Sequence, residues 1–197
     1  SSETYLKSLN IWDDIIRKQV FVATKVWDQN SHGRLNFHAK DENMEHLGYI
    51  IENDLIQSAL LGAIDKNKIE FFNAKLSGLI KIDSGYEVNL DNQASLSCRL
   101  LIGADGARSR VRTMSAIEAT EHDYHQKAII ANIVSEKSFQ KTTWQRFLSD
   151  SIIALLPLSE NQASIVWSCK NHLADELTKL DGDKFNQSLS EVVEYRF

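Results

Sequence analysis

The stretch Leu100–Arg112, LLIGADGARSRVR, decides how the rest of the chain is interpreted. It begins with apolar residues suited to a strand that is buried on both faces, and it continues into Gly103, Asp105 and Gly106. Glycines at the end of a buried strand let the backbone approach a ligand closely, because they have no Cβ atom. An acidic group followed by basic groups at such a strand end can hold a hydroxyl-rich, phosphate-bearing molecule.

The same turn also has a simpler interpretation, in which the glycines permit positive φ angles and the arginines are solvated. The position of Asp105 favours the ligand interpretation, because open α/β sheets bind ligands at the carboxyl ends of their strands. Arg108 and Ser109 follow at once and could contact phosphate or ribose groups.

The composition excludes several classes of protein. A net charge of −5 over 197 residues argues against a nucleic-acid-binding protein, which needs a basic face. There is no run of about 18 apolar residues that could span a membrane, and the first residues do not form a signal peptide. Cys98 and Cys169 stand far apart, which suits reduced thiols in a cytoplasmic protein.

Helical periodicity covers residues 3–18 and 51–64. Asn10 is expected to interrupt the first helical stretch, because asparagine tolerates the left-handed conformation that ends a helix. Asp54, followed three residues later by Gln57, resembles a capping box at the start of the second.

Strand patterns fill most of the remaining chain. A β-hairpin is predicted over 19–39 and is followed by a loop over 40–47. A short strand at 69–74 precedes a three-stranded meander over 76–102, whose last strand runs buried into the opening motif. A polar link then leads to further predicted elements, namely strands at 128–134, 142–148, 151–158 and 163–168 and a helical region at 172–197. The hairpin and the late strands resemble a separate antiparallel sheet, and residues 51–112 resemble a helix plus meander that leads to the ligand turn.

Residues 103–112, GADGARSRVR, resemble the DG motif (DGxxSxxR) of the class A flavin-dependent monooxygenases, the p-hydroxybenzoate hydroxylase superfamily. Asp105, Gly106, Ser109 and Arg112 match its fixed positions. Other segments resemble, in order, those of the aromatic-ring hydroxylases of ubiquinone biosynthesis: LNIWD (9–13), LGYIIEN (47–53), WQRFL (144–148), ALLPL (154–158) and SIVWS (164–168).

This resemblance implies an α/β fold, which within this fragment is α+β. Residues 1–18 and 49–114 would form part of an FAD-binding domain with a helix and a three-stranded meander. Residues 19–48 and 115–197 would form a substrate-binding domain with an antiparallel sheet and a C-terminal helix. Members of the family also have an N-terminal GxGxxG segment and a C-terminal GD motif, so we expect an internal piece of a longer enzyme that alone binds FAD poorly and is inactive.

The resemblance also implies an activity. It is hydroxylation of the aromatic ring of a polyprenylated phenol in ubiquinone biosynthesis, with FAD as cofactor and NAD(P)H and O₂ as co-substrates, through a C4a-hydroperoxyflavin. The implied partners are the prenylated phenol and a ubiquinone-biosynthesis complex, and the implied location is the cytoplasm or the periphery of the inner membrane. Two alternatives stay open: a non-catalytic assembly module derived from a flavoenzyme, and a class A hydroxylase of a different phenol.

The residues expected to contact the cofactor are those of the DG motif: Gly103, Asp105, Gly106, Arg108, Ser109 and Arg112. The expected substrate wall consists of Trp144, Phe147, Leu155, Leu156, Pro157 and Trp167, each of which could also be ordinary core. No catalytic side chain and no metal ligand is predicted, because the cofactor carries this chemistry. One position departs from the family pattern, since most of these hydroxylases have arginine where Asp54 stands, and an acidic group there would repel a pyrophosphate.

Overall fold

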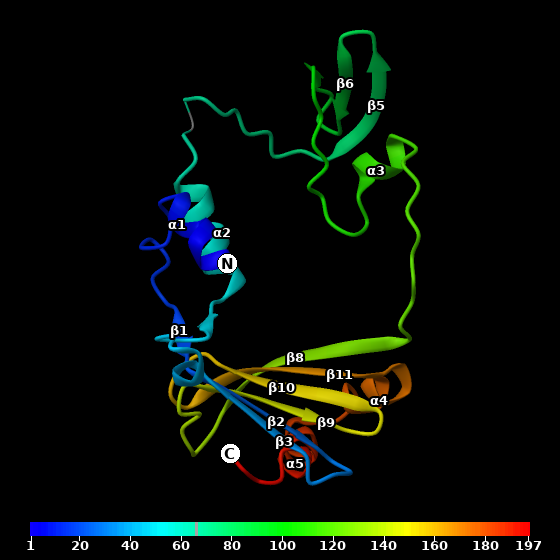
Figure 1. The fold of residues 1–197 in the computed structure, drawn as a ribbon. Coiled ribbons are helices and arrows are strands. Elements are labelled where there is room, and N and C mark those ends of the chain that lie inside the picture. The colour runs from blue at the N-terminus through cyan, green and yellow to red at the C-terminus, as the bar shows by residue number, and fades with distance from the viewer. Residues whose placement is uncertain (66) are drawn as a thin grey trace. The chain divides into compact units, whose positions relative to one another are not determined.

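The computed structural model describes residues 1–65 and 67–197, which form two compact units. The first unit contains residues 1–64 and 123–197, and the second contains residues 65–122. Each unit is described by itself, and Figure 1 gives the labels of their elements.

The first unit contains a six-stranded sheet with the strand order β3-β2-β9-β10-β11-β8. These strands confirm the predicted hairpin and the four predicted later strands. The prediction of an antiparallel sheet is wrong at one pair, because β2 lies parallel to β9 while all other neighbours are antiparallel. A hairpin makes only antiparallel neighbours, whereas β2 meets a strand more than a hundred residues further along the chain. The bounds are Ala23–Asp28 (β2), Arg34–His38 (β3), Gln126–Val134 (β8), Thr142–Phe147 (β9), Ser151–Pro157 (β10) and Gln162–Lys170 (β11).

Two helices cover one face of this sheet, as Figure 1 shows: α4 (Asn171–Leu177) and α5 (Gly182–Val192). The helical prediction for this region is therefore confirmed, although the helix breaks after Leu177 and a new one begins beyond Asp181. The Asp181 carboxylate accepts a hydrogen bond from the backbone N–H of Lys184 (2.9 Å), which caps α5. Apolar residues of the two helices pack on alternate residues of β10 and β11 to form the main core.

The start of the chain forms helix α1 (Ser2–Ser8), and Asn10 follows with a φ of +57°. The predicted interruption at Asn10 is confirmed, but residues 11–18 form turns and loop instead of a continued helix. Ile11 and Ile15 are buried all the same, together with Leu6 and Ala59. Ile11 and Ile15 thus have the spacing of a helix in the sequence because both side chains are buried, although the backbone around them is not helical.

Between α1 and α2 in the chain, β1 (Gln19–Phe21) and β4 (Gly48–Ile50) pair as a short two-stranded sheet. A 3₁₀ turn, η1 (Ala39–Glu42), occupies part of the predicted loop. Helix α2 spans Asn53–Gly62 with Glu52 at its N-cap, and no side chain caps it. The predicted capping box is therefore wrong, because Asp54 lies inside the first turn, where its charge favours the helix dipole.

The second unit contains the predicted meander of β5 (Leu76–Ile82), β6 (Gly85–Leu90) and β7 (Ser95–Cys98), together with the short helix α3 (Arg110–Met114). Gly85 has a φ of +143°, and a Cβ atom there would meet the carbonyl oxygen of Cys98 at 2.1 Å, so the turn before β6 requires glycine.

Two predictions for the second unit are wrong. Residues 69–74 form no strand, and Ile69 and Phe71 are exposed. The strand expected to continue through 100–102 stops at Cys98. Its partner β6 begins at Gly85, one residue before the Tyr86–Cys98 pair, and so has no residue opposite 100–102. Leu100 and Ile102 are therefore 73% and 77% exposed, and none of the strands described for this chain pairs with them.

Candidate functional site

The DG turn is held in shape by hydrogen bonds among its own residues. One carboxylate oxygen of Asp105 accepts a short hydrogen bond from the Ser109 hydroxyl. The other accepts bonds from the backbone N–H groups of Arg110 (2.6 Å) and Val111 (3.2 Å), which are the free donors at the start of α3. Asp105 therefore fastens the turn to the helix that follows it.

Ser109 and Arg112 complete this network. The Ser109 hydroxyl oxygen caps α3 by accepting from the backbone N–H of Arg112 (3.0 Å), and the residue is only 8% exposed. The Arg112 guanidinium donates to the carbonyl oxygen of Ala107 (2.8 Å) and lies 3.8 Å from a Glu121 carboxylate oxygen. Three of the four fixed positions of the motif thus maintain the shape of the turn.

The electrostatics of the turn follow from these contacts. The hydrogen bond from the Ser109 hydroxyl, helped by the backbone N–H groups of Val111 and Arg110, lowers the pKa of the Asp105 carboxyl below its ordinary value against a smaller opposing effect of desolvation. Asp105 is therefore an anion at neutral pH.

Other residues of the turn remain available to a ligand. Gly106 has a φ of +83°, and a Cβ atom there would meet nothing within 4 Å, so its backbone is open on that side. Gly103 instead packs against the Val111 side chain, which a Cβ atom would approach to 3.0 Å. Arg108 is exposed. The turn also borders a small hollow of about 200 Å³ beside Tyr86, Leu101 and Ile117.

The residues predicted as a substrate wall divide between the two faces of the six-stranded sheet. Successive residues of a strand point to opposite faces, so Leu155 and Leu156 cannot share a surface. Leu155 and Trp167 belong to the core under α4 and α5, and Trp144 packs against the same core. Pro157, two residues after Leu155, is buried on that face as well.

The helix-covered face is held together by hydrogen bonds, an aromatic contact and an ion pair. The Trp167 indole N–H donates to the Ser151 hydroxyl (3.1 Å), and the Trp144 ring lies edge-on to Phe197 with centroids 5.2 Å apart. Arg146, only 7% exposed, pairs with Glu194 at 2.9 Å and donates to the carbonyl oxygen of Val192. These contacts are those of a protein core.

Phe147 and Leu156 point to the opposite face of the sheet, which neither α4 nor α5 covers. Phe147 is 39% exposed and lies opposite Ile152 in the β9–β10 register. Thr24 and Thr143 lie on the same face and share a hydrogen bond of 2.8 Å. We call this surface the open face; its apolar members are Val26, Leu35, Phe37, Ala128, Ile130, Val134, Phe147, Ile152, Ala154, Leu156 and Val166.

Most of the open face was not identified from the sequence. Strand alternation could have separated Leu156 from Leu155, because the two are adjacent. It could not have added Val26 and Leu35, since their place on this surface depends on the parallel β2–β9 pairing, which neither strand specifies by itself.

Comparison with known proteins agrees with this geometry. A family described as an FAD binding domain matches residues 66–196. The chain belongs to this FAD-binding family. Its curated relatives include the mitochondrial ubiquinone biosynthesis monooxygenase COQ6 of Mus musculus, 34% identical over 203 residues, and that of Homo sapiens, 35% identical over 198 residues. These alignments cover 96% and 93% of this chain but 42% of each relative, so the chain spans about two fifths of their length.

Solved structures of similar fold include two proteins of low sequence identity. Pseudomonas aeruginosa PqsL in complex with 2-aminobenzoylacetate has a TM-score of 0.73 and 17% identity, over 89% of this chain and 50% of PqsL. Klebsiella pneumoniae HpxO in complex with FAD and uric acid has a TM-score of 0.71 and 15% identity, over 96% of this chain and 50% of HpxO. These structures confirm the expected fold class, and the sequence matches confirm the resemblance given above.

The DG turn fits a contact with FAD, the cofactor of this family. Its open backbone at Gly106 and the exposed Arg108 suit the anionic and hydroxyl-rich parts of a dinucleotide. The Asp105 carboxylate is already occupied by three donors, so its part in binding would be to hold the turn rather than to reach the ligand alone. In the first turn of α2, Asp54 supplies an acidic group instead of a cation that could bind a pyrophosphate, as the sequence indicated.

Proposed function

We propose that this chain is part of an FAD-dependent monooxygenase that hydroxylates the aromatic ring of a polyprenylated phenol in ubiquinone biosynthesis. The observation that carries the proposal is the match to COQ6 relatives along almost the whole chain, which includes both the DG turn and the strands of the open face. NAD(P)H as co-substrate and O₂ belong to the same proposal.

The DG turn would contribute to binding FAD. Gly106 and Arg108 would contact the cofactor, and Asp105, Ser109 and Arg112 would keep the turn in the shape that presents them. When bound, FAD would supply the activation of oxygen, and the protein would supply binding, orientation and exclusion of water.

The open face would form one wall of the substrate site. Its apolar side chains suit an aromatic ring with an isoprenoid tail, because burial of such a ligand removes apolar surface of both partners from water. Within the predicted wall, this assigns substrate contact to Phe147 and Leu156 and leaves Trp144, Leu155, Pro157 and Trp167 as the support behind them.

The location and partners remain part of the proposal. The part of the chain that the structure describes includes no helix with the length and apolar character that a membrane crossing requires. We propose a peripheral association with the inner membrane and with other enzymes of ubiquinone synthesis, because a prenylated substrate resides in lipid.

A cellular experiment tests this function. Cells that lack the full-length protein should accumulate a prenylated phenol one oxygen atom short of the next intermediate, and the restored wild-type gene should remove it. Unchanged ubiquinone and no accumulated precursor would contradict the proposal. A precursor whose removal requires the protein but not its bound FAD would favour the non-catalytic assembly module instead.

A further inference from the structure

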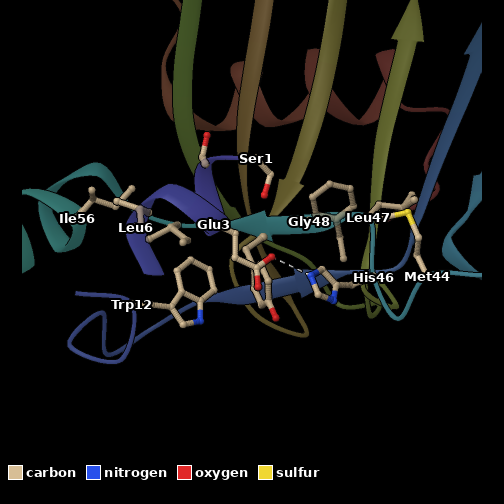
Figure 2. Close-up of a pocket in the computed structure, with 13 residues that line it drawn as sticks. Ser1, Glu3, Leu6, Trp12, Met44, His46, Leu47, Gly48 and Ile56 are labelled. Carbon is tan, nitrogen blue, oxygen red and sulfur yellow. Dashed lines mark hydrogen bonds and ion pairs between the residues drawn. The ribbon is translucent and has the colours of Figure 1, made fainter. Parts of the chain in front are cut away.

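A second cavity lies in the first unit and is formed by none of the residues of the open face. It has a volume of about 430 Å³ and is bordered by α1, by the loop before β4 and by α2 (Figure 2). Its lining is mostly apolar, with Leu6, Trp12 and Leu47 among the contributing side chains. This size falls in the range of pockets that hold small organic ligands, about 300–1,000 Å³.

One polar pair stands inside this apolar lining. The Nε2 atom of His46 lies 3.1 Å from a Glu3 carboxylate oxygen, and each side chain is 23% exposed. Figure 2 shows Glu3 between Trp12 and His46, with the dashed line joining the carboxylate to the imidazole. Both rings also contact Tyr49, with centroids 5.0 Å away for Trp12 and 4.7 Å for His46.

This geometry sets the hydrogen-bonding character of His46. A carboxylate anion only accepts hydrogen bonds, and the bond from Lys7 (2.7 Å), together with that to His46, lowers the pKa of the Glu3 carboxyl. Nε2 must therefore carry the proton, so the Nδ1 atom of the neutral imidazole is an acceptor. Within the described residues, Nδ1 of His46 has no hydrogen-bond donor.

The charged groups near the cavity are engaged within the protein, which favours a neutral ligand. The Lys7 ammonium pairs with Glu3 and lies 5.6 Å from the centre of the Trp12 ring, and the Lys18 ammonium lies 5.1 Å from it. The Glu3 carboxylate in the lining already pairs with Lys7 and bonds to His46, so a charged ligand gains no free counter-ion from it. A flat, uncharged ring suits Trp12 and Tyr49, since aromatic pairs stack or meet edge to face.

We propose that this cavity binds a neutral aromatic molecule with one hydroxyl group, whose ring lies among Trp12, Tyr49 and the apolar lining and whose hydroxyl donates to Nδ1 of His46. Glu3 is a positioning residue that fixes the tautomer of His46. The site is separate from the proposed substrate wall, so it stands whether or not the proposed hydroxylation is correct.

Equilibrium dialysis of the full chain at pH 8 with three probes tests the proposal: naphthol, naphthalene and naphthoate. Naphthol should bind about fivefold more tightly than naphthalene, the effect of one neutral hydrogen bond, and naphthoate should bind most weakly. In His46→Phe the preference for naphthol over naphthalene should disappear, whereas the matched control His32→Phe, at an exposed residue of the β2–β3 turn, should keep it.

A second variant separates loss of the site from loss of the fold. Met44 lines the cavity and is 50% exposed, so Met44→Trp should fill the space without disturbing the core and should abolish binding of both naphthol and naphthalene. The proposal is overturned if naphthol does not bind the wild-type chain, if naphthoate binds most tightly, or if a folded Met44→Trp variant binds as the wild type does.

Discussion

Leu155 and Leu156 offer a direct test of the two-faced sheet, because they are adjacent, identical in type and placed on opposite faces. Leu155 is fully buried under α4 and α5, and Leu156 is only partly buried on the open face. Leu155→Ala removes three carbon atoms from a closed core and leaves a cavity, which lowers the free energy of unfolding by about 2–5 kcal/mol. Leu156→Ala loses part of the burial of the same atoms, and we expect a loss of about 1 kcal/mol.

Urea unfolding followed by tryptophan fluorescence measures this difference. Trp27, Trp144 and Trp167 all lie on the helix-covered side of this sheet, so the signal reports mainly on that core. With a slope of about 2 kcal/mol per molar urea, the midpoint should fall by about 1–2.5 M for Leu155→Ala and by about 0.5 M for Leu156→Ala. Equal losses, or a larger loss for Leu156→Ala, would refute the assignment of the two faces.

The remaining predictions concern the DG turn and the open face. Ser109→Ala removes both the N-cap of α3 and a donor to Asp105. The local stability of this turn should fall by about 1 kcal/mol, so hydrogen exchange of the Val111 and Arg112 amides should become faster. Ser115→Ala at the other end of the helix should leave their exchange rates nearly unchanged. The pKa of the Asp105 carboxyl is lowered in the folded chain. The protection of these amides should therefore be complete above the ordinary carboxyl pKa of 3.8 and should be lost as the pH falls through the lower pKa of the folded chain. Asp105→Asn should remove this pH dependence, and a wild-type pH profile in that variant would contradict the hydrogen-bond network. In the full-length protein, Arg108→Gln should weaken FAD binding about tenfold by fluorescence titration, whereas Arg99→Gln, an exposed arginine before the turn, should not; equal effects would remove the role given to Arg108.

The strands with strict alternation could be predicted from the sequence with good boundaries. Each strand from Gln126 to Lys170 carries its own pattern of apolar and polar residues, and each forms close to its predicted bounds. The interruption at Asn10 was equally local, because it depends on one residue that adopts a positive φ.

Predictions that depended on a neighbour failed. Leu100–Ile102 has the composition of a buried strand, but a strand needs a partner, and β6 begins at Gly85 with no residue opposite this segment. The strand predicted at 69–74 also does not form, and none of the described strands pairs with this segment. The parallel pairing of β2 with β9 could not be inferred, because it is a property of two distant segments and not of either one.

Predictions for the candidate site show the same contrast between local features and features that depend on neighbouring segments. The DG turn was assigned from its resemblance to a family motif, which suggested that Asp105 and Ser109 face a ligand. In the structure they bond chiefly to each other and to the start of α3. The predicted substrate wall combined residues of both faces of the sheet, since aromatic and aliphatic residues occur on both sides of it.

The central claim is that this chain belongs to a ring hydroxylase whose substrate meets the open face. The most direct test incubates the purified full-length protein with FAD, NAD(P)H, O₂ and a short-chain prenylated phenol, and measures the product by mass spectrometry. We predict a product with one added oxygen atom, formed more slowly by Leu156→Glu than by Lys179→Glu, a change at an exposed residue after α4. Absence of an oxygenated product from the flavin-loaded protein, or equal rates for the two variants in folded form, would contradict the account.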